Sequence, residues 1–241
     1  MSKVIAIFGA GTGLGVSVAR RFGREGFRVA LVARRQERLD ALAEQLKDEG
    51  IEAAGFTADL SRPADVPALI ASIRDHFGRI DVIEYGPVGS EQDFTPAARV
   101  DAAVLETHIP MFLLTPVEAV RAALPEWTGR GDGAFLMTTG LTAVHPMPEL
   151  SGLGPVGAAA RNYLYSLNAE LADSGIYAGT LSVGAMISRS EMSERFAAAG
   201  TDPELLASFP VVDPDELAEQ YWDMYTKRDR VEQIHPQPQA A

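Results

Sequence analysis

The sequence predicts a single doubly wound α/β domain, in which helices flank a mostly parallel sheet of seven strands. Short, near-continuous runs of Val, Ile, Leu and Ala alternate with amphipathic stretches, a pattern typical of buried parallel strands and crossover helices. The alternation continues to about residue 182 without a shift in composition. The chain has 241 residues, 46% of them hydrophobic, which suits one domain with an ordinary core and excludes a disordered chain.

Seven short apolar runs are expected to form the strands. They lie near residues 4–8, 28–32, 52–57, 80–84, 133–138, 177–182 and, more weakly, 231–234. Because the runs are near-continuous rather than alternating, helices are expected to cover both faces of the sheet.

Five amphipathic stretches between these runs are expected to form crossover helices. They lie near residues 14–24, 36–48, 63–77, 96–124 and 155–173. The helical period is clearest in the second of them, where Leu39, Leu42 and Leu46 share one stripe and the charged side chains face water.

Prolines mark helix boundaries and breaks. Thr95–Pro96 and Asp213–Pro214 each place a capping side chain before a proline at the first helical position, so both predict a helix start. Pro110 and Pro116 fall inside the fourth helical stretch, where a kink or a break is expected.

The charge balance disfavours two classes of partner. With 21 basic and 33 acidic residues the net charge is −12, so neither a nucleic-acid backbone nor an anionic membrane surface is expected to bind. Residues 1–38 nevertheless carry eight basic side chains against two acidic ones, a local charge of +6, which suggests a small anionic ligand. A solvated helix face is the alternative, and the preferred one for Arg20, Arg21 and Arg24.

Composition excludes further classes. The chain has no Cys, which removes thiol nucleophiles, Cys-ligated metals and disulfides and fits a reducing compartment.

Apolar runs such as Val4–Phe8 are far shorter than the ~20 residues of a membrane span, and Met1–Lys3 leads into a strand rather than a signal peptide, so a cytoplasmic location is expected. The four histidines lack ligand spacing and no G-x-S-x-G occurs, so no metal site and no zinc or serine hydrolase is expected.

A glycine-rich loop joins the first strand to the first helix. It comprises Gly9, Ala10, Gly11, Thr12, Gly13, Leu14 and Gly15. Its tight turn needs residues without a Cβ, and amides at a helix N-terminus are ready partners for a pyrophosphate. A plain tight connection is the alternative, but the position after the first strand of a βαβ series favours a Rossmann-type dinucleotide site.

The spacing of Gly9, Gly13 and Gly15 resembles the GxxxGxG loop of the short-chain dehydrogenase/reductase family, and the resemblance covers most of the chain. Asp59–Leu60 resembles the family's acidic turn that touches adenine, and residues 183–188 resemble the segment that holds the nicotinamide carboxamide, with valine in place of the usual proline. The resemblance implies cofactor contacts at Gly9, Gly11, Thr12, Gly13, Leu14, Gly15, Arg34, Arg35, Asp59, Leu60, Tyr85, Gly86, Gly184, Met186 and Ser188.

The end of the second strand bears on the choice of cofactor. Ala33 stands where NAD-dependent members of the family carry an acid for the ribose 2′-hydroxyl, and Arg34 follows it. A guanidinium binds a 2′-phosphate through its planar donor fork, so the resemblance implies NADP, with NADPH preferred over NADH. Arg35 either shares this contact or covers the face of the next helix.

The family's catalytic set is missing on this alignment. Family members use a Ser, a Tyr, a Lys one helical turn later and an Asn on the preceding long helix. These positions fall on Gly140, Leu153, Gly157 and Thr107, with the family's separation of thirteen residues between the first two. Leucine has no proton to give and glycine no charge, so ordinary ketoreduction is expected to be lost.

Three polar residues near the expected crevice, Tyr85, Thr139 and His145, are candidate catalytic residues. Tyr85 ends the fourth strand, Thr139 and Thr142 flank the vacant serine position, and His145 follows in a loop with an imidazole suited to proton transfer at neutral pH. The alternatives are that the tyrosine packs, the threonine is structural and the histidine is solvated. Glycines at 152, 154 and 157 widen the site, which suits a bulky apolar ligand or a site under no chemical demand.

Two functions stay open. The favoured one is an NADP-dependent oxidoreductase that transfers hydride to or from a bulky small-molecule carbonyl or imine with a non-standard proton donor, because the dinucleotide site is retained. The other is a non-redox protein of this fold, acting as a cofactor-binding sensor, a scaffold or an inactive partner subunit. A lyase or isomerase has no specific residue behind it.

One domain is expected over residues 1–234, with a lid near 188–209 and a disordered tail at 235–241. The helices near 96–124 and 155–173 resemble the pair through which family members dimerise. A homodimer or homotetramer is therefore expected.

Overall fold

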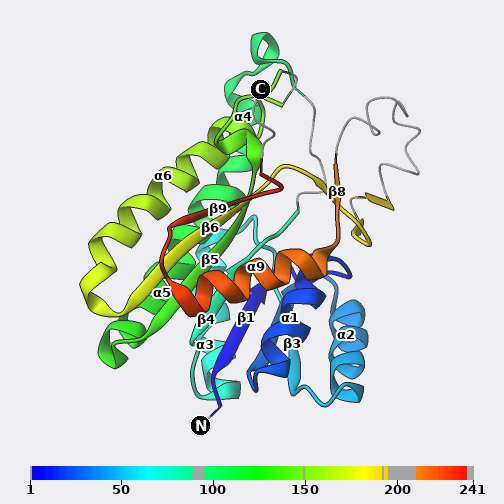
Figure 1. Ribbon diagram of the computed structural model, residues 1–241, viewed down its shortest axis with the longest axis vertical. Helices are drawn as coiled ribbons and strands as arrows, with labels where there is room; N and C mark the ends of the chain where they lie inside the picture. Colours follow the sequence, from blue (N-terminus) through cyan, green and yellow to red (C-terminus); the bar gives the residue numbers. More distant parts are fainter. Residues whose placement is uncertain (1, 89–94, 149, 192, 195–209, 238–241) are drawn as a thin grey trace.

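Seven parallel strands form the main sheet of the computed structural model, which describes residues 2–88, 95–148, 150–191, 193–194 and 210–237. Their order is β3-β2-β1-β4-β5-β6-β9 (Figure 1). They are β1 Val4–Phe8, β2 Arg28–Ala33, β3 Ala53–Thr57, β4 Val82–Tyr85, β5 Gly133–Gly140, β6 Ile176–Val183 and β9 Glu232–His235. All seven predicted strands are confirmed. Because every neighbouring pair is parallel, their carboxyl ends meet at one edge of the sheet.

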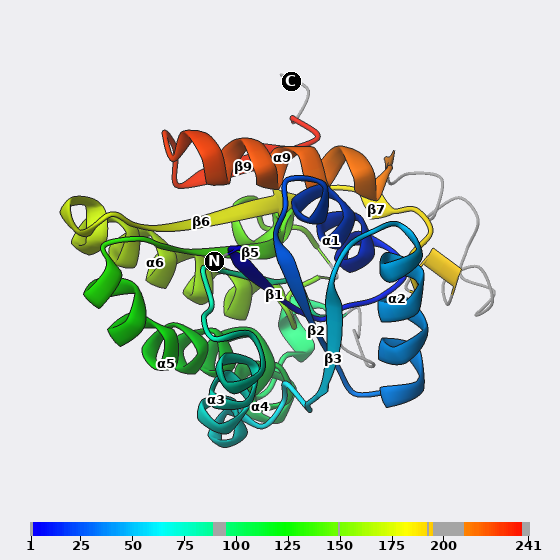
Figure 2. The same cartoon turned by 90° about the horizontal axis from the view of Figure 1, so that it is seen from below.

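Helices cover both faces of this sheet. On one face lie α1 Leu14–Arg24, α2 Gln36–Asp48 and α9 Pro214–Lys227, and on the other lie α3 Val66–Phe77, α5 Thr115–Arg130 and α6 Gly154–Leu171 (Figure 2). A shorter helix, α4 Ala102–Ile109, leads into α5, and β7 Met186–Ile187 pairs with β8 Val211–Val212 outside the main sheet. The predicted doubly wound α/β domain is confirmed.

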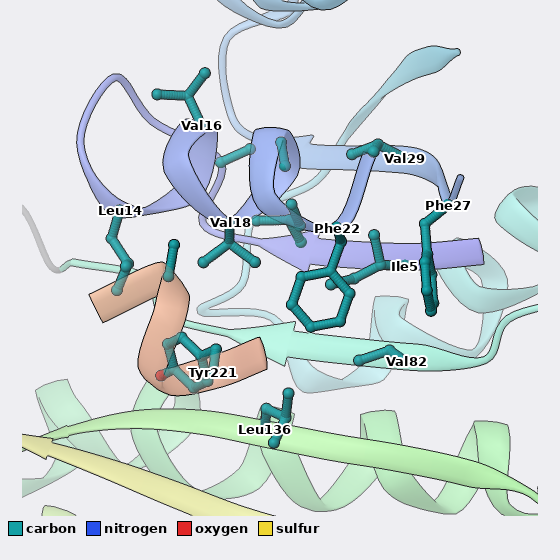
Figure 3. Close-up of a cluster of buried hydrophobic side chains, with 14 of the residues drawn as sticks. Ile5, Leu14, Val16, Val18, Phe22, Phe27, Val29, Val82, Leu136 and Tyr221 are labelled. Carbon is teal, nitrogen blue, oxygen red and sulfur yellow. The ribbon is translucent and has the colours of Figure 1, made fainter. Parts of the chain in front are cut away.

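Two apolar cores result, one on each side of the sheet, because successive strand side chains point to opposite faces. Figure 3 shows the core beneath α1 and α9, where Ile5, Val18, Phe22 and Tyr221 gather over the strands. All four side chains are fully buried. Each such side chain contributes roughly 1.5–3 kcal/mol relative to exposure, and together they fix α1 against the first strand.

The helix predicted from Thr95–Pro96 begins later. That dipeptide precedes only a single 3-10 turn, and α4 starts at Ala102. The cap is Asp101, whose carboxylate accepts a hydrogen bond from the amide of Val104 at 3.0 Å. A carboxylate at this position satisfies an amide that has no partner within the helix, so the helix start predicted at Thr95–Pro96 is wrong.

The long helical run through α4 and α5 is irregular at Pro110. A π-helical turn, Pro110–Leu114, separates the two helices, because proline has no N–H to continue the α-helical ladder. The kink expected near Pro110 is thereby confirmed. By length and composition alone the run Ala102–Arg130 is apolar enough to cross a membrane, but its α5 part packs in the core through buried side chains that include Trp127.

The C-terminal part of the chain adds a helix and the last strand. Asp213 caps α9 as predicted, because its carboxylate accepts from the amide of Asp215 at 2.8 Å. His235 is the last residue of β9 and the first of the predicted disordered tail, 235–241. Most of the predicted lid, 195–209, and the last four residues lie outside the described part of the chain.

Candidate functional site

The candidate site lies at the carboxyl edge of the sheet, between β1 and β4. The chain leaves β1 toward β2 on one side and β4 toward β5 on the other, so the connections diverge there and open a crevice in which doubly wound folds bind ligands. The glycine loop, residues 9–15, is the β1–α1 connection at this point. Its first two amides, those of Gly9 and Ala10, both donate to the carbonyl of Val32 at 2.9 Å.

Three positions of the loop admit no side chain. Gly9 has a φ of +102°, and a Cβ there would lie 2.5 Å from the Cα of Pro87. A Cβ at Gly15 would lie 2.9 Å from the Cα of Ala10, and one at Gly13 2.9 Å from the Cβ of Ser190. At Gly11, by contrast, the described residues other than its two chain neighbours place no atom closer than 3.9 Å to such a Cβ. The close packing that the glycine spacing predicted is therefore present.

Within the described part of the chain, no side chain caps the amino end of α1, and the amide of Val16 in its first turn donates to the carbonyl of Gly11 at 3.0 Å. Gly13 occupies the capping position and has no side chain, and no acidic residue lies in the first helical turn. Leu14 and Gly15 are buried beneath the loop. A free helix N-terminus of this kind favours an anion such as a pyrophosphate.

Cationic side chains gather where β2 ends. Arg34 is exposed and adds to the lowering of the Asp59 pKa, which is due first to hydrogen bonds from the hydroxyl and amide of Ser61. Arg35 instead donates to the carboxylate of Glu191 at 2.6 and 2.7 Å. Arg38, one helical turn further along α2, donates to the same carboxylate.

The β6–β7 connection borders the crevice on its other side. The amide of Gly184 donates to the carbonyl of His235 at 2.9 Å, and a Cβ at Gly184 would lie 2.7 Å from a methyl carbon of Leu141. The amides of Met186 and Ser188 donate to Pro210 and Val212 at 2.8 and 2.9 Å. These bonds fix the backbone of the segment that contains Ser188.

Tyr85 is not placed to act on a ligand. Its ring is fully buried, and its hydroxyl donates to the carbonyl of Met111 in the π-helical turn at 2.5 Å. Burial raises the pKa of this phenol well above its ordinary value. The side chain predicted to act in catalysis and to contact the cofactor thus packs between β4 and the helices, whereas Gly86 stays at the strand end.

Thr139 is also withdrawn from the crevice. Its hydroxyl lies 3.0 Å from that of Thr180 and 2.9 Å from that of Ser182, both on β6. Ser182 in turn donates to Glu232, which pairs with Arg161 of α6 at 2.6 Å. The hydroxyl predicted to act in catalysis is thus the inner end of a buried network that joins β5, β6, β9 and α6.

The hydroxyl of Thr142 lies beside Gly140, the position that the prediction gave to a serine. A Cβ at residue 140 would lie 3.3 Å from the Oγ1 of Thr142, and one at Gly154 would lie 3.6 Å from its Cβ. A Cβ at Gly157 would lie 3.3 Å from that of Ala143. The turn after β5 thus meets the first turn of α6, and the half-buried hydroxyl of Thr142 stands between Gly140 and Gly154.

His145, Leu153 and Thr107 were also considered at the predicted site, and each has different surroundings. His145 is exposed in the loop after that turn, and its amide donates to Leu141 at 2.8 Å. Leu153 is half-buried directly before α6. Thr107 is exposed on α4, and its hydroxyl donates back to the carbonyl of Ala103 at 2.9 Å, so it is engaged with its own helix.

No tyrosine and lysine meet at the carboxyl edge of the sheet, and all residues of both types lie in the described part of the chain. The lysines are Lys3, Lys47 and Lys227, and the tyrosines are Tyr85, Tyr163, Tyr165, Tyr177, Tyr221 and Tyr225. A tyrosine hydroxyl accepts from a lysine only at Tyr225, 2.8 Å from Lys3. That pair lies before β1, at the opposite edge of the sheet from the glycine loop.

One feature of the surroundings, a buried carboxyl group, escaped sequence reasoning. Glu84 on β4 is buried beside Thr138, whose hydroxyl lies 3.2 Å from its carboxylate and 2.5 Å from the hydroxyl of Tyr221. Burial raises the pKa of Glu84 to about 8. In the sequence, the only sign of this buried carboxyl group is that a single acidic residue interrupts an apolar run.

The arginines of α1 form a separate hollow with acidic neighbours. About 260 Å³ lies between α1 and α9, lined partly by Arg20, Arg21 and Arg24. Arg20 pairs with Glu49 at 2.8 Å and Arg21 with Glu25 at 2.6 Å. Arg20 and Arg21 are thus engaged in surface ion pairs, as expected for a solvated helix face. Much of the positive charge near the glycine loop lies instead at the end of β2.

Comparison with known proteins gives a consistent relationship. The family described as short chain dehydrogenase matches residues 3–199. A putative ketoacyl reductase of Streptomyces coelicolor is 31% identical over 180 residues, which cover 73% of this chain and 67% of that protein.

Solved structures with the same fold include two that contain a cofactor. L-sorbose reductase from Gluconobacter frateurii complexed with NADPH and L-sorbose has a TM-score of 0.81 at 24% identity, covering 94% and 90% of the chains. A metagenomic short-chain oxidoreductase in complex with NADP has a TM-score of 0.78 at 22% identity, covering 97% of each.

Proposed function

Because this chain belongs to the short-chain dehydrogenase family, we propose that it is an NADP(H)-dependent oxidoreductase acting on a bulky carbonyl or imine without the family's tyrosine as proton donor. The observation that carries the proposal is the glycine loop, where Gly9, Gly13 and Gly15 leave no room for a Cβ. Such a cradle brings the backbone close to a dinucleotide pyrophosphate. Relatives and structural neighbours described as reductases or as NADP complexes support it.

Different residues of the chain would hold different parts of the cofactor. The amides at the start of α1 would bind the pyrophosphate, and Asp59 and Leu60 would border the adenine. Arg34 and Arg35 would bind the 2′-phosphate through their guanidinium forks. Gly184, Met186 and Ser188 would flank the nicotinamide, which supplies or accepts a hydride when bound.

Thr142 is the residue that we propose orients the substrate. Its hydroxyl adjoins Gly140 and Gly154, the place that the family alignment gives to a carbonyl-binding serine. A threonine hydroxyl can donate to a substrate oxygen but is too weak an acid to replace a phenol. The proton then comes from water or from His145, which is exposed two residues beyond the turn.

The same positions favour a large apolar substrate. Gly140, Leu153 and Gly157 stand where the family alignment places a serine, a tyrosine and a lysine, so the site gains volume and loses charge. A cationic imine suits this site because it accepts a hydride without prior protonation. We therefore propose iminium compounds and activated ketones as the substrate classes.

The choice of cofactor is tested by titration with NADPH and NADH. NADPH is expected to bind more tightly, and Arg34→Ala to raise its dissociation constant about tenfold while leaving that of NADH within about twofold, since a charge-assisted hydrogen bond contributes about 1.5–3 kcal/mol. The matched control is Arg24→Ala, which removes an exposed arginine of α1 away from the end of β2. Equal affinity of the unmodified protein for both cofactors would contradict the proposal.

The role of Thr142 is tested by turnover with NADPH over a panel of bulky ketones, enones and imines. Thr142→Val is expected to lower kcat/KM for ketones about 10²-fold, because the variant keeps the shape and loses the donor, while Thr142→Ser keeps most of the rate. Thr139→Val, the matched control, removes a buried hydroxyl from the β5–β6 network and is expected to lower stability more than turnover. Unchanged kcat/KM in Thr142→Val would eliminate this assignment.

A further inference from the structure

The segment after β7 lies directly on the glycine loop. The hydroxyl of Thr12 donates to the carbonyl of Arg189 at 3.3 Å, and the Cβ of Ser190 stands 2.9 Å from where a side chain at Gly13 would begin. Arg189 has a positive φ of 57° and donates to Asp213 and Asp215, at the start of α9, at 2.5 and 2.9 Å. Residues 188–191 are thus anchored on both sides of the dinucleotide crevice.

Glu191 ends this anchored stretch and reaches the cations at the end of β2. Its carboxylate accepts from Arg35 at 2.6 and 2.7 Å and also from Arg38. The side chain of Glu191 is 29% exposed, against about half for each arginine. Partial burial alone would raise the pKa of Glu191, but Arg35 and Arg38 outweigh it and lower that pKa below its ordinary value. The carboxylate is therefore an ionised acceptor shared between two guanidinium groups.

A carboxylate and a phosphate monoester compete for such a pair because both accept charge-assisted hydrogen bonds from the guanidinium fork. The carboxylate and the phosphate cannot bind the two arginines together without a loss of binding free energy, because two anions held a few ångströms apart repel each other. A ribose 2′-hydroxyl faces no such conflict, because it carries no charge.

We propose that Glu191 sets the cofactor selectivity of this protein by acting as an internal anion that the 2′-phosphate must displace from Arg35 and Arg38. The inference rests on the proposed NADP(H) function and goes beyond it. Glu191 weakens the binding of NADP(H), leaves NAD(H) unaffected, and links arrival of the phosphate to release of residues 188–191 from the end of β2.

The test uses calorimetric titration with two fragments that do not require turnover. Adenosine 2′,5′-bisphosphate carries the 2′-phosphate, and adenosine 5′-monophosphate does not. Glu191→Gln is expected to tighten binding of the bisphosphate about three- to tenfold, the value of two partly exposed ion pairs, and to change binding of the monophosphate less than about twofold. Glu194→Gln, the matched control, makes the same change of net charge at an exposed position of the same segment and is expected to change neither affinity by more than about twofold.

The outcomes separate this inference from the function beneath it. If the bisphosphate binds the unmodified protein but Glu191→Gln leaves its affinity unchanged or lowers it, the competition is refuted and the NADP(H) assignment stands. Equal tightening of both fragments, or an equal effect of Glu194→Gln, refutes a specific competition with the phosphate. If the bisphosphate binds no more tightly than the monophosphate to either protein, the NADP(H) assignment fails and the inference fails with it.

Discussion

Gly9→Ala is expected to lower the free energy of unfolding by about 3 kcal/mol or more and to abolish binding of NADPH. The backbone at this position has a φ of +102°, and the new Cβ would meet the Cα of Pro87 at 2.5 Å. A left-handed backbone costs a residue with a side chain about 1–2 kcal/mol, and overpacking against a backbone atom costs about 1–3 kcal/mol more. The loop must move away from the β4 end to relieve the contact, which displaces the amides proposed to hold the pyrophosphate.

Gly11→Ala is the matched control in the same loop. In the part of the chain that the structure describes, the nearest atom beyond its chain neighbours is 3.9 Å from the added Cβ, so the change is expected to alter the free energy of unfolding by less than about 0.5 kcal/mol. Urea denaturation of the three proteins measures the stability, and fluorescence titration with NADPH measures the binding. Equal losses in the two variants would contradict the steric account of the loop.

Glu84→Gln is expected to stabilise the protein increasingly as the pH rises. The pKa of Glu84 is raised by burial to about 8 in the folded chain, against 4.5 ordinarily. The folded state therefore binds this proton more tightly than the unfolded state, and its contribution to stability is fully present below about pH 4.5 and is lost as the pH rises through about 8. Since each tenfold difference in proton affinity between the folded and unfolded states corresponds to about 1.4 kcal/mol, the neutral glutamine is expected to gain up to about 5 kcal/mol at about pH 9.

Urea denaturation midpoints at about pH 5, 7 and 9 measure this gain. Glu37→Gln on the exposed side of α2 is the control, and it is expected to give a small difference that does not change with pH. A stability gain in Glu84→Gln that is the same at about pH 5 and pH 9 would show that the carboxyl is not kept neutral by burial.

The fold was predictable from the sequence because its signals are local. Each strand is a short apolar run, so all seven were located to within a few residues. The start of α4 was missed because two candidate caps compete there, and Asp101 supplies a side-chain bond to the helix where Thr95 does not. Which cap forms depends on where the preceding chain is held, and that is set by tertiary contacts.

The candidate site was predictable only where backbone geometry decides it. Gly9 and Gly15 are demanded by close approach of main-chain atoms, and the glycine spacing shows this directly. The surroundings of the Tyr85 and Thr139 side chains could not be predicted, because a strand residue near the end of a sheet can face either side of it. The groups that these side chains contact come from distant parts of the chain: the carbonyl of Met111 for Tyr85 and the hydroxyl of Ser182 for Thr139. The ion pair between Glu191 and Arg35 spans 156 residues, so no local pattern announces it.

A structure of the protein crystallised with NADPH tests the central claim most directly, because it shows which side chains face the nicotinamide ring. We predict that the pyrophosphate lies on the amides at the start of α1, that Thr142 is the hydroxyl-bearing side chain closest to the reactive carbon of the ring, and that Leu153 stands beside it. A tyrosine hydroxyl and a lysine ammonium found together within hydrogen-bonding reach of that position, or a cofactor bound away from the glycine loop, would contradict the claim.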